Sequence, residues 1–241
     1  METDSKNPKW SWLDAALVLA ALFAMIPVAP ALRHFLRQIY KLIDLSRVTQ
    51  NSLQLFAGTL LQAGLIIAAV MLLTRRKGSS TRDLGLIWTN VGGNIKSGLL
   101  GGVVLSVTVI GLGVLVSVVI GPPPPQDVEK MLTGIKQGKD ILLPFISVSI
   151  LAPISEELYF RGMVYPLIRS KWGVRTALIL SGFFFSAMHF DLYRLIPIGV
   201  GGMVLAYFYE KTGSLVTSIT AHSTWNTLML LMMFLARQTG L

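Results

Sequence analysis

Three charged residues lie inside a segment that is otherwise apolar and long enough to cross a bilayer. Glu156, Glu157 and Arg161 occur in the sequence ISEELYFRGMVY, within the mostly apolar stretch 141–168. A transmembrane helix needs about 20 predominantly apolar residues, and each charge at membrane depth costs about 2.5–3.5 kcal/mol on insertion scales. The fold must therefore supply these charges with partners or with a water-filled space.

The composition of the whole chain is typical of a multi-pass membrane protein. Of its 241 residues, 53% are hydrophobic and 14% are charged, whereas soluble domains carry about 25% charged residues. We expect an all-α, polytopic membrane helix bundle of about seven transmembrane helices, within a range of about six to eight. The expected spans are 13–32, 53–73, 98–120, 141–168, 176–190, 195–209 and 215–236.

The net charge of +9 indicates membrane lipids as partners and not nucleic acid. Lysines and arginines in the loops can lie beside anionic headgroups, and no basic run is interleaved with aromatics as a single-strand binder requires. The chain has no cysteine, which excludes disulfides, thiol nucleophiles and thiolate metal sites.

The segments between the expected spans have distinct characters. Residues 34–47 have charges at helical spacing among Leu and Ile, which fits an amphipathic surface helix or a solvated helical loop. The span 98–120 is rich in Gly and Val, and we expect it to pack tightly in the bundle. Pro122–Pro125 predict a stiff connector, followed by a polar surface helix or loop at 126–140.

Helical spacing separates the roles of the three charges. Glu157 and Arg161 are four residues apart, so they share a helix face and can form an ion pair. Glu156 diverges from its neighbour by about 100° and is left free. A free carboxylate at membrane depth is a candidate general base.

Two further polar pairs occur at the same four-residue spacing in later spans. Phe185 and His189 share one face, and His222 and Asn226 share another. Two of the three histidines of the chain are thus at membrane depth. We expect these polar groups to face the glutamates around a wet cavity.

Such a cavity could hydrolyse a peptide bond. Glu156 and His189 could share and deprotonate a water, while His222 and Asn226 could donate hydrogen bonds to an oxyanion. Alternatively, zinc could bind Glu156, His189 and His222, although the mechanism does not require a cofactor. The sequence has no H-E-x-x-H, G-x-S-G or G-x-G-D signature of other intramembrane proteases.

The three motifs resemble those of the CPBP family, the CAAX-protease and bacteriocin-processing (Abi or Rce1-like) intramembrane proteases. The resemblance rests on Glu-Glu-x-x-x-Arg at 156–161, Phe-x-x-x-His at 185–189 and His-x-x-x-Asn at 222–226, in that order. It implies a catalytic core at 141–236, preceded by a transmembrane region with surface helices at 1–140 and followed by a tail at 237–241.

The resemblance also implies roles for the motif residues. Glu156 and His189 would activate water, and His222 and Asn226 would form the oxyanion site. The supporting residues would be Glu157, Arg161 and Phe185, the last as part of the cavity lining. The substrate would be a membrane-associated protein or peptide, which in eukaryotic members is a prenylated CAAX protein.

Less specific interpretations of the same residues stay open. Pro153 and Ser155 could begin a helix at the water interface, with the two glutamates in its first turn. The chain could be a non-catalytic scaffold or maturation factor on the same fold, or a proton-coupled transporter. Met229, Met232 and Met233 are expected on a lipid-facing or packing surface, and Tyr193 at the membrane interface.

Overall fold

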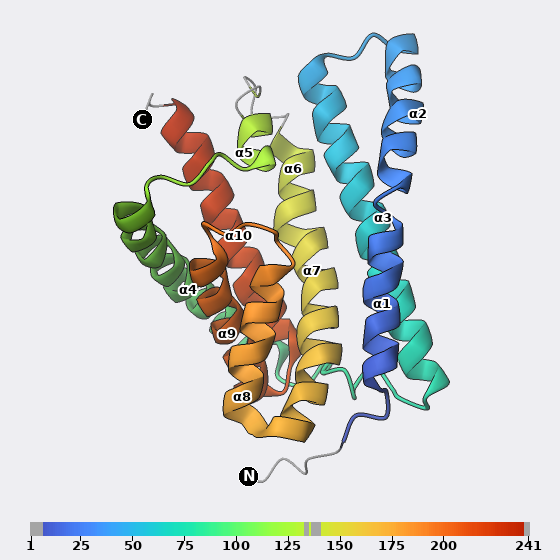
Figure 1. The fold of residues 1–241 in the computed structure, drawn as a ribbon, viewed down its shortest axis with the longest axis vertical. Coiled ribbons are helices and arrows are strands. Elements are labelled where there is room, and N and C mark those ends of the chain that lie inside the picture. Colours follow the sequence, from blue (N-terminus) through green and yellow to red (C-terminus); the bar gives the residue numbers. More distant parts are fainter. Residues whose placement is uncertain (1–6, 133–134, 136–140, 239–241) are drawn as a thin grey trace.

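The computed structural model describes residues 7–132, 135 and 141–238, and the regular elements among them are all helical (Figure 1), as the sequence predicts. Two short π-helical stretches, Ser147–Leu151 and Leu158–Val164, flank the helix that carries the paired glutamates. The α-helices are α1 (Trp12–Ala24), α2 (Val28–Leu42), α3 (Arg47–Arg76), α4 (Val91–Ile120), α5 (Asp127–Leu132), α6 (Leu142–Ile146), α7 (Ala152–Glu157), α8 (Tyr165–Ala187), α9 (Leu195–Thr212) and α10 (Leu215–Gln238).

The chain is a multi-pass membrane protein, but the predicted count of seven spans is not confirmed. Within the described residues, three helical segments are long and apolar enough to cross a membrane, or up to four if the bent pair of α1 and α2 is one span. The segments α9 and α10 are not among them, because polar residues such as Glu210 and His222 lower their hydropathy. Within the bundle, α9 packs mainly against α8, and α10 packs mainly against α4.

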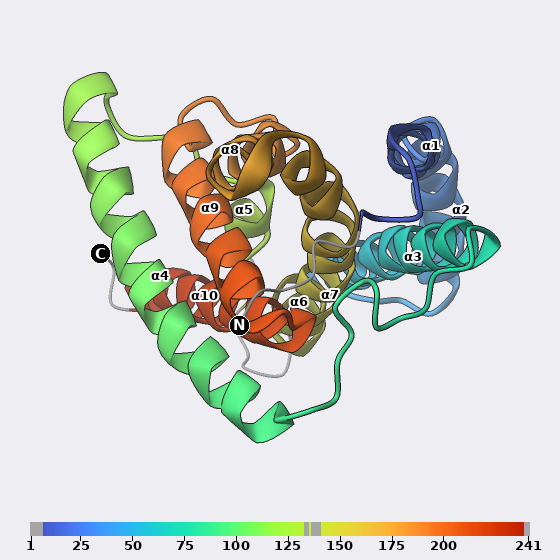
Figure 2. The ribbon, with the colours of Figure 1, turned by 90° about the horizontal axis from the view of Figure 1, so that it is seen from below.

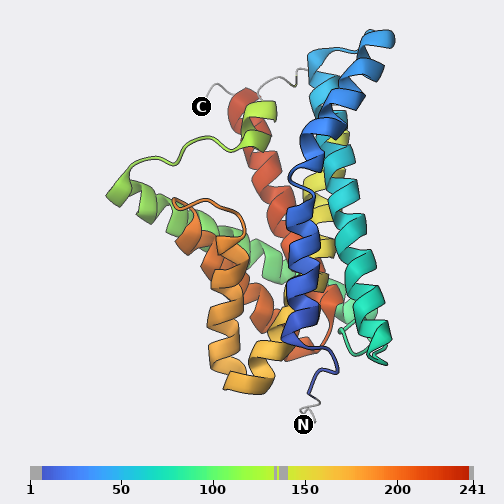
Figure 3. The same ribbon diagram turned by 45° about the vertical axis from the view of Figure 1, so that its right-hand side comes forward.

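The helix of the first expected span, 13–32, is interrupted within that range. The helix α1 stops at Ala24, Pro27 precedes α2, and the axes of the two helices differ by 41°. Proline removes a backbone donor and clashes with the preceding turn, which favours a break at this point. The amphipathic helix therefore begins at Val28 and not at His34, and it lies beside the upper half of α3 in Figures 1 and 3.

The segment 142–187 folds as two helical limbs. Gly173 has φ 77°, a left-handed conformation that glycine adopts at low cost. Figure 1 shows the chain reversing there, so that α7 descends and α8 returns beside it. The limbs correspond to the expected spans 141–168 and 176–190, although α8 ends at Ala187.

Glycines on one face of α4 allow it to approach α10 closely, as the composition of this span predicts. A Cβ on Gly98 or Gly102 would lie 2.5 Å from the Cβ of Thr220 or Thr224, respectively. The glycine face ends about half-way along the helix, and Figures 2 and 3 show the C-terminal half of α4 diverging from α10. Val118 is 80% exposed there.

The connector at Pro122–Pro125 is non-helical, and α5 follows it, as the polar segment after the prolines predicts. The rest of the predicted segment 126–140 lies outside the described residues, apart from Ile135. The predicted tail at 237–241 overlaps the end of α10, which reaches Gln238, and its last residues, 239–241, are also outside them.

Candidate active site

The buried centre of the site is an ion pair between Glu157 and Arg161, as their spacing predicts. Both side chains are 0% exposed, and Nη1 of Arg161 donates to Oε1 of Glu157 over 2.6 Å. The other terminal nitrogen, Nη2, donates to the backbone carbonyl of Gly202 over 2.9 Å. The guanidinium also lies 4.6 Å from the centroid of the Phe185 ring, within cation–π range.

Close packing of α8 on α9 brings the Gly202 carbonyl within reach. A Cβ on Gly202 would lie 2.9 Å from Cα of Gly182, so a larger residue would push the two helices apart. Gly182 and Gly202 thus contribute to the site by allowing the backbones of α8 and α9 to approach each other closely.

The ion pair is linked to α10 through His222. Its Nδ1 lies 2.9 Å from Oε1 of Glu157, the same oxygen that accepts from Arg161. Its Nε2 lies 3.8 Å from Oε2 of Glu156, whose side chain is 22% exposed. The imidazole stacks on Trp225, with ring centroids 5.5 Å apart. Glu157 therefore fixes the ring so that Nε2 faces Glu156.

His189 lies just beyond the C-terminus of α8 and is solvent-exposed. Its Nδ1 is 2.9 Å from the carbonyl oxygen of Phe185, one helical turn earlier. Because a carbonyl oxygen only accepts, Nδ1 carries the proton and Nε2 of the neutral ring is available as a base. Phe190 follows with φ 52°, a left-handed conformation in the turn after α8.

Phe185 supports the site from behind. It is fully buried, and its ring lies 4.7 Å from the His189 ring and 5.6 Å from the His222 ring. Its side chain is not among those that line the cavity described below. The Phe185 ring thus contacts both histidines and the guanidinium of Arg161.

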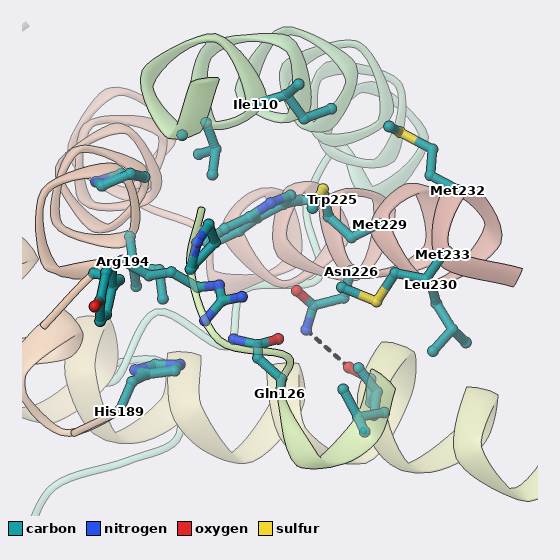
Figure 4. A pocket seen from close by; sticks show the side chains of 18 of the residues that line it. Ile110, Gln126, His189, Arg194, Trp225, Asn226, Met229, Leu230, Met232 and Met233 are labelled. Carbon is teal, nitrogen blue, oxygen red and sulfur yellow. Dashed lines mark hydrogen bonds between the residues drawn. The ribbon is translucent and has the colours of Figure 1, made fainter. Parts of the chain in front are cut away.

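Asn226 lies one turn after His222 and contacts the π-helical stretch Ser147–Leu151. Its Nδ2 donates to the carbonyl oxygen of Val148 over 2.8 Å, the dashed line in Figure 4. A π-helical stretch alters the local i→i−4 pairing and is frequent at functional sites. Among the described residues no other group accepts from this amide, so its second N–H can donate to a ligand.

One cavity of about 540 Å³ joins these residues. The four predicted catalytic residues, Glu156, His189, His222 and Asn226, all line it, although they come from α7, the end of α8 and α10. The remaining walls come from α4, α5, α9 and the loop before it, the proline connector and the π-helical stretch Ser147–Leu151, with one residue from α3. The volume is typical of small-ligand and peptide-segment sites.

The comparisons with known proteins point to the same part of the chain. Residues 138–228 match the family described as "Type II CAAX prenyl endopeptidase Rce1-like". This segment is similar to the Rce1-like family. All three motifs lie inside it, and its bounds are close to the expected core at 141–236.

Curated relatives resemble the Rce1-like segment over a similar length. "UPF0177 protein YaiF" of Lactococcus lactis is 37% identical over 35% of this chain and 38% of its own length. "Putative membrane peptidase YdiL" of Bacillus subtilis is 31% identical over 37% of each chain. An "Uncharacterized 24.3 kDa protein" of Escherichia coli is 27% identical over 40% of this chain and 46% of its own length. Each match therefore spans less than half of the relative, and no solved structure matches the chain.

Several residues that line the cavity were not predicted from the sequence as site residues. The expected lipid-facing or packing residues Met229, Met232 and Met233 line the cavity (Figure 4), as does Tyr193, which was expected at the membrane interface. Methionine side chains are adaptable and frequent at surfaces that bind varied partners, so the methionine cluster is the one feature of the composition that could have indicated a binding surface here. Arg194 also lines the cavity and had no local pattern to mark it.

The predicted zinc set of Glu156, His189 and His222 stays a prediction. Both Nε2 atoms and the carboxylate are suitable donors for zinc. Within the described part of the chain, however, no three His, Cys, Asp or Glu side chains are grouped so that they could hold a metal ion.

Proposed function

We propose that the protein is an intramembrane endopeptidase that hydrolyses a peptide bond of a membrane-associated protein or peptide. The observation that carries the proposal is the convergence of Glu156, His189, His222 and Asn226 on one cavity from three separate parts of the fold. The Rce1-like match over 138–228 supports it independently.

In the proposed reaction, Glu156 and His189 activate a water. Glu156 is partly exposed to the cavity, and His189 presents Nε2 because Nδ1 donates to the Phe185 carbonyl. A water held between them would lose its proton to Glu156 as its oxygen attacks the peptide carbonyl. The same carboxyl group would then return the proton to the leaving amine, which balances the reaction.

The oxyanion formed by this attack would be stabilised by His222 and Asn226. Since Nδ1 of His222 donates to Glu157, the ring must carry both protons to donate through Nε2 as well. Asn226 would supply the N–H of its amide that is not bonded to Val148. Glu157 and Arg161 would keep His222 oriented, so they are positioning residues.

The proposal uses these side chains without a cofactor. If zinc were bound by Glu156, His189 and His222, it would lower the pKa of a bound water. No step of the proposed reaction depends on it.

The test is proteomics of protein termini in membranes that contain either the wild-type chain or Glu156→Gln. We expect new termini in the wild type that disappear in the variant, while both proteins insert to the same level. Glu129→Gln is the matched control, because this carboxylate lies on α5 and is not a lining residue of the cavity. It should keep the wild-type termini.

The opposite outcome would favour the scaffold hypothesis. If wild-type and Glu156→Gln membranes had identical termini while a cellular function of the wild-type protein persisted in the variant, the polar cluster would be structural. Cleavage of a confirmed substrate by Glu156→Gln at the wild-type rate would remove Glu156 as the base.

A further inference from the structure

The cavity contains a cationic side chain that the proposed hydrolysis does not use. Arg194 directly precedes α9, five residues after His189. Among the described residues that line the cavity, it is the sole lysine or arginine. Much of the wall around it is apolar, with contributions from Pro197, Ile198 and Trp225.

Two contacts hold the guanidinium of Arg194 in place. Nη1 donates to Oδ2 of Asp191 over 2.6 Å, and Nη2 donates to the carbonyl oxygen of Pro124 over 3.0 Å. Asp191 in turn accepts the backbone N–H of Arg194 over 3.1 Å. The side chain is thereby fixed between its own loop and the proline connector, so little conformational entropy is lost when it binds a ligand.

The contacts of Arg194 leave part of its donor capacity unused. A guanidinium has five N–H groups, and its two contacts within the described residues leave three of them for a ligand. Asp191 neutralises the charge but is not a lining residue, so a group in the cavity meets the guanidinium and not the carboxylate. Figure 4 shows the fork of Arg194 at the cavity, which Gln126 also lines.

We propose that Arg194 binds a carboxylate of the peptide in the cavity and so selects substrates that carry one. This inference rests on the proposed peptidase function. The planar fork of Arg matches a carboxylate with two parallel hydrogen bonds, and the apolar surroundings strengthen them. The carboxylate could belong to the C-terminus of the chain or to an Asp or Glu side chain, since both present the same group.

The experiment measures binding in the absence of turnover. The full-length Glu156→Gln chain is placed in phosphatidylcholine nanodiscs, and binding is followed by fluorescence polarisation of an N-terminally labelled apolar tetrapeptide. Three forms of the probe are compared: a free C-terminal carboxylate, a C-terminal amide, and the amide with one internal Asp. We expect a carboxylate form to bind about tenfold more tightly than the neutral amide, and the preferred form identifies the source of the carboxylate.

Variants of Arg194 then assign the preference to this side chain. Arg194→Gln should bind carboxylate and amide probes equally, with the affinity for the amide unchanged. Arg194→Lys should retain a weaker preference, because an ammonium lacks the fork. Arg175→Gln removes an equal charge from an exposed position on α8 and should preserve the full preference.

A variant that keeps Arg194 covers the case in which Arg194→Gln fails to fold. Asp191→Asn removes the competing carboxylate and should increase the preference for the carboxylate probe. The proposal is overturned if all three probes bind equally to the parent protein, if Arg194→Gln retains the preference, or if Asp191→Asn loses it. It is also overturned if phosphatidylglycerol nanodiscs abolish the preference by competition, because Arg194 would then hold a lipid phosphate.

The outcome is separable from that of the peptidase proposal. Binding is read in a variant that is designed not to cleave, so a carboxylate preference that requires Arg194 would support this inference even if Glu156-dependent termini were absent. Conversely, Glu156-dependent cleavage combined with equal binding of the probes would overturn this inference and leave the peptidase proposal standing.

Discussion

Glu157→Gln is expected to destabilise the protein strongly, because it leaves a buried guanidinium without its counter-charge. Both partners of the ion pair are 0% exposed, so water does not screen the loss. Removing one partner of a buried pair costs about 3–5 kcal/mol. Arg161 keeps its hydrogen bond to the Gly202 carbonyl and its contact with the Phe185 ring, so we expect a value near the lower limit, about 3 kcal/mol.

The measurement is the apparent Tm of detergent-purified protein, read as loss of the monodisperse peak after heating. For a domain of this size, about 2–4 °C is lost per kcal/mol, so the expected decrease is about 6–12 °C. Glu210→Gln is the matched control. Its carboxylate is 20% exposed and accepts hydrogen bonds from Arg169 and Tyr165. Glutamine keeps an accepting oxygen and the pair is partly exposed, so we expect a smaller decrease in Tm than for Glu157→Gln.

The refuting result is a decrease in Tm for Glu157→Gln that is no larger than that for Glu210→Gln. The double variant with Arg161→Met provides a second check, because it removes the stranded charge together with its lost partner. It should regain most of the stability, while the proposed peptidase activity should stay low because His222 Nδ1 no longer faces a charged carboxylate.

Three further predictions follow from other contacts. Gly102→Leu should separate α4 from α10 and lower the Tm, because even a Cβ would lie 2.5 Å from a threonine side chain; a Tm equal to that of the wild type would contradict the close packing. Trp10→Phe removes the 2.9 Å hydrogen bond from the indole to the carbonyl oxygen of Met163 in a π-helical stretch, and should cost about 1–3 kcal/mol, measured by the same assay. Burial raises the pKa of the Asp191 carboxyl, but the hydrogen bonds from the side chain and backbone of Arg194, together with the charge of Arg194, outweigh burial and lower the pKa. The carboxylate therefore stabilises the fold fully above the pKa of the unfolded chain, about 3.9, and this stabilisation is lost as the pH falls through the lower pKa of the folded state. Asp191→Asn should weaken the pH dependence of the Tm below about pH 4.

Local periodicity explains which parts of the site could be predicted. The Glu157–Arg161 pair lies within one helical segment at a separation of four residues, where helix geometry alone brings side chains together. The contact from His222 to Glu157 joins residues 65 positions apart and depends on how α10 packs against α7. The spacing of the motifs predicted a shared cavity, but it could not reveal that Glu157 holds His222.

Single residues that redirect the backbone explain most of the differences in fold. Pro27 ended the first helix before its apolar run was complete, and Gly173 reversed the chain between the limbs. Helical periodicity could not identify Arg194 as a site residue, because one of its contacts is with Asp191 in a loop and the other is with a backbone carbonyl 70 residues away. The pattern of side chains in the sequence does not show which backbone carbonyl a side chain will contact.

The two π-helical stretches on either side of α7 help to set the direction in which the side chains of α7 point. A π-type turn accommodates one more residue than an α-type turn, and each residue of an α-helix advances the side-chain direction by about 100°. The direction of Glu156 and Glu157 relative to α6 thus depends on how many residues lie within Ser147–Leu151. Deleting Ile150 from that stretch would turn Glu156 away from the cavity without removing any residue that lines it, so the length of this segment is as much a part of the site as its side chains.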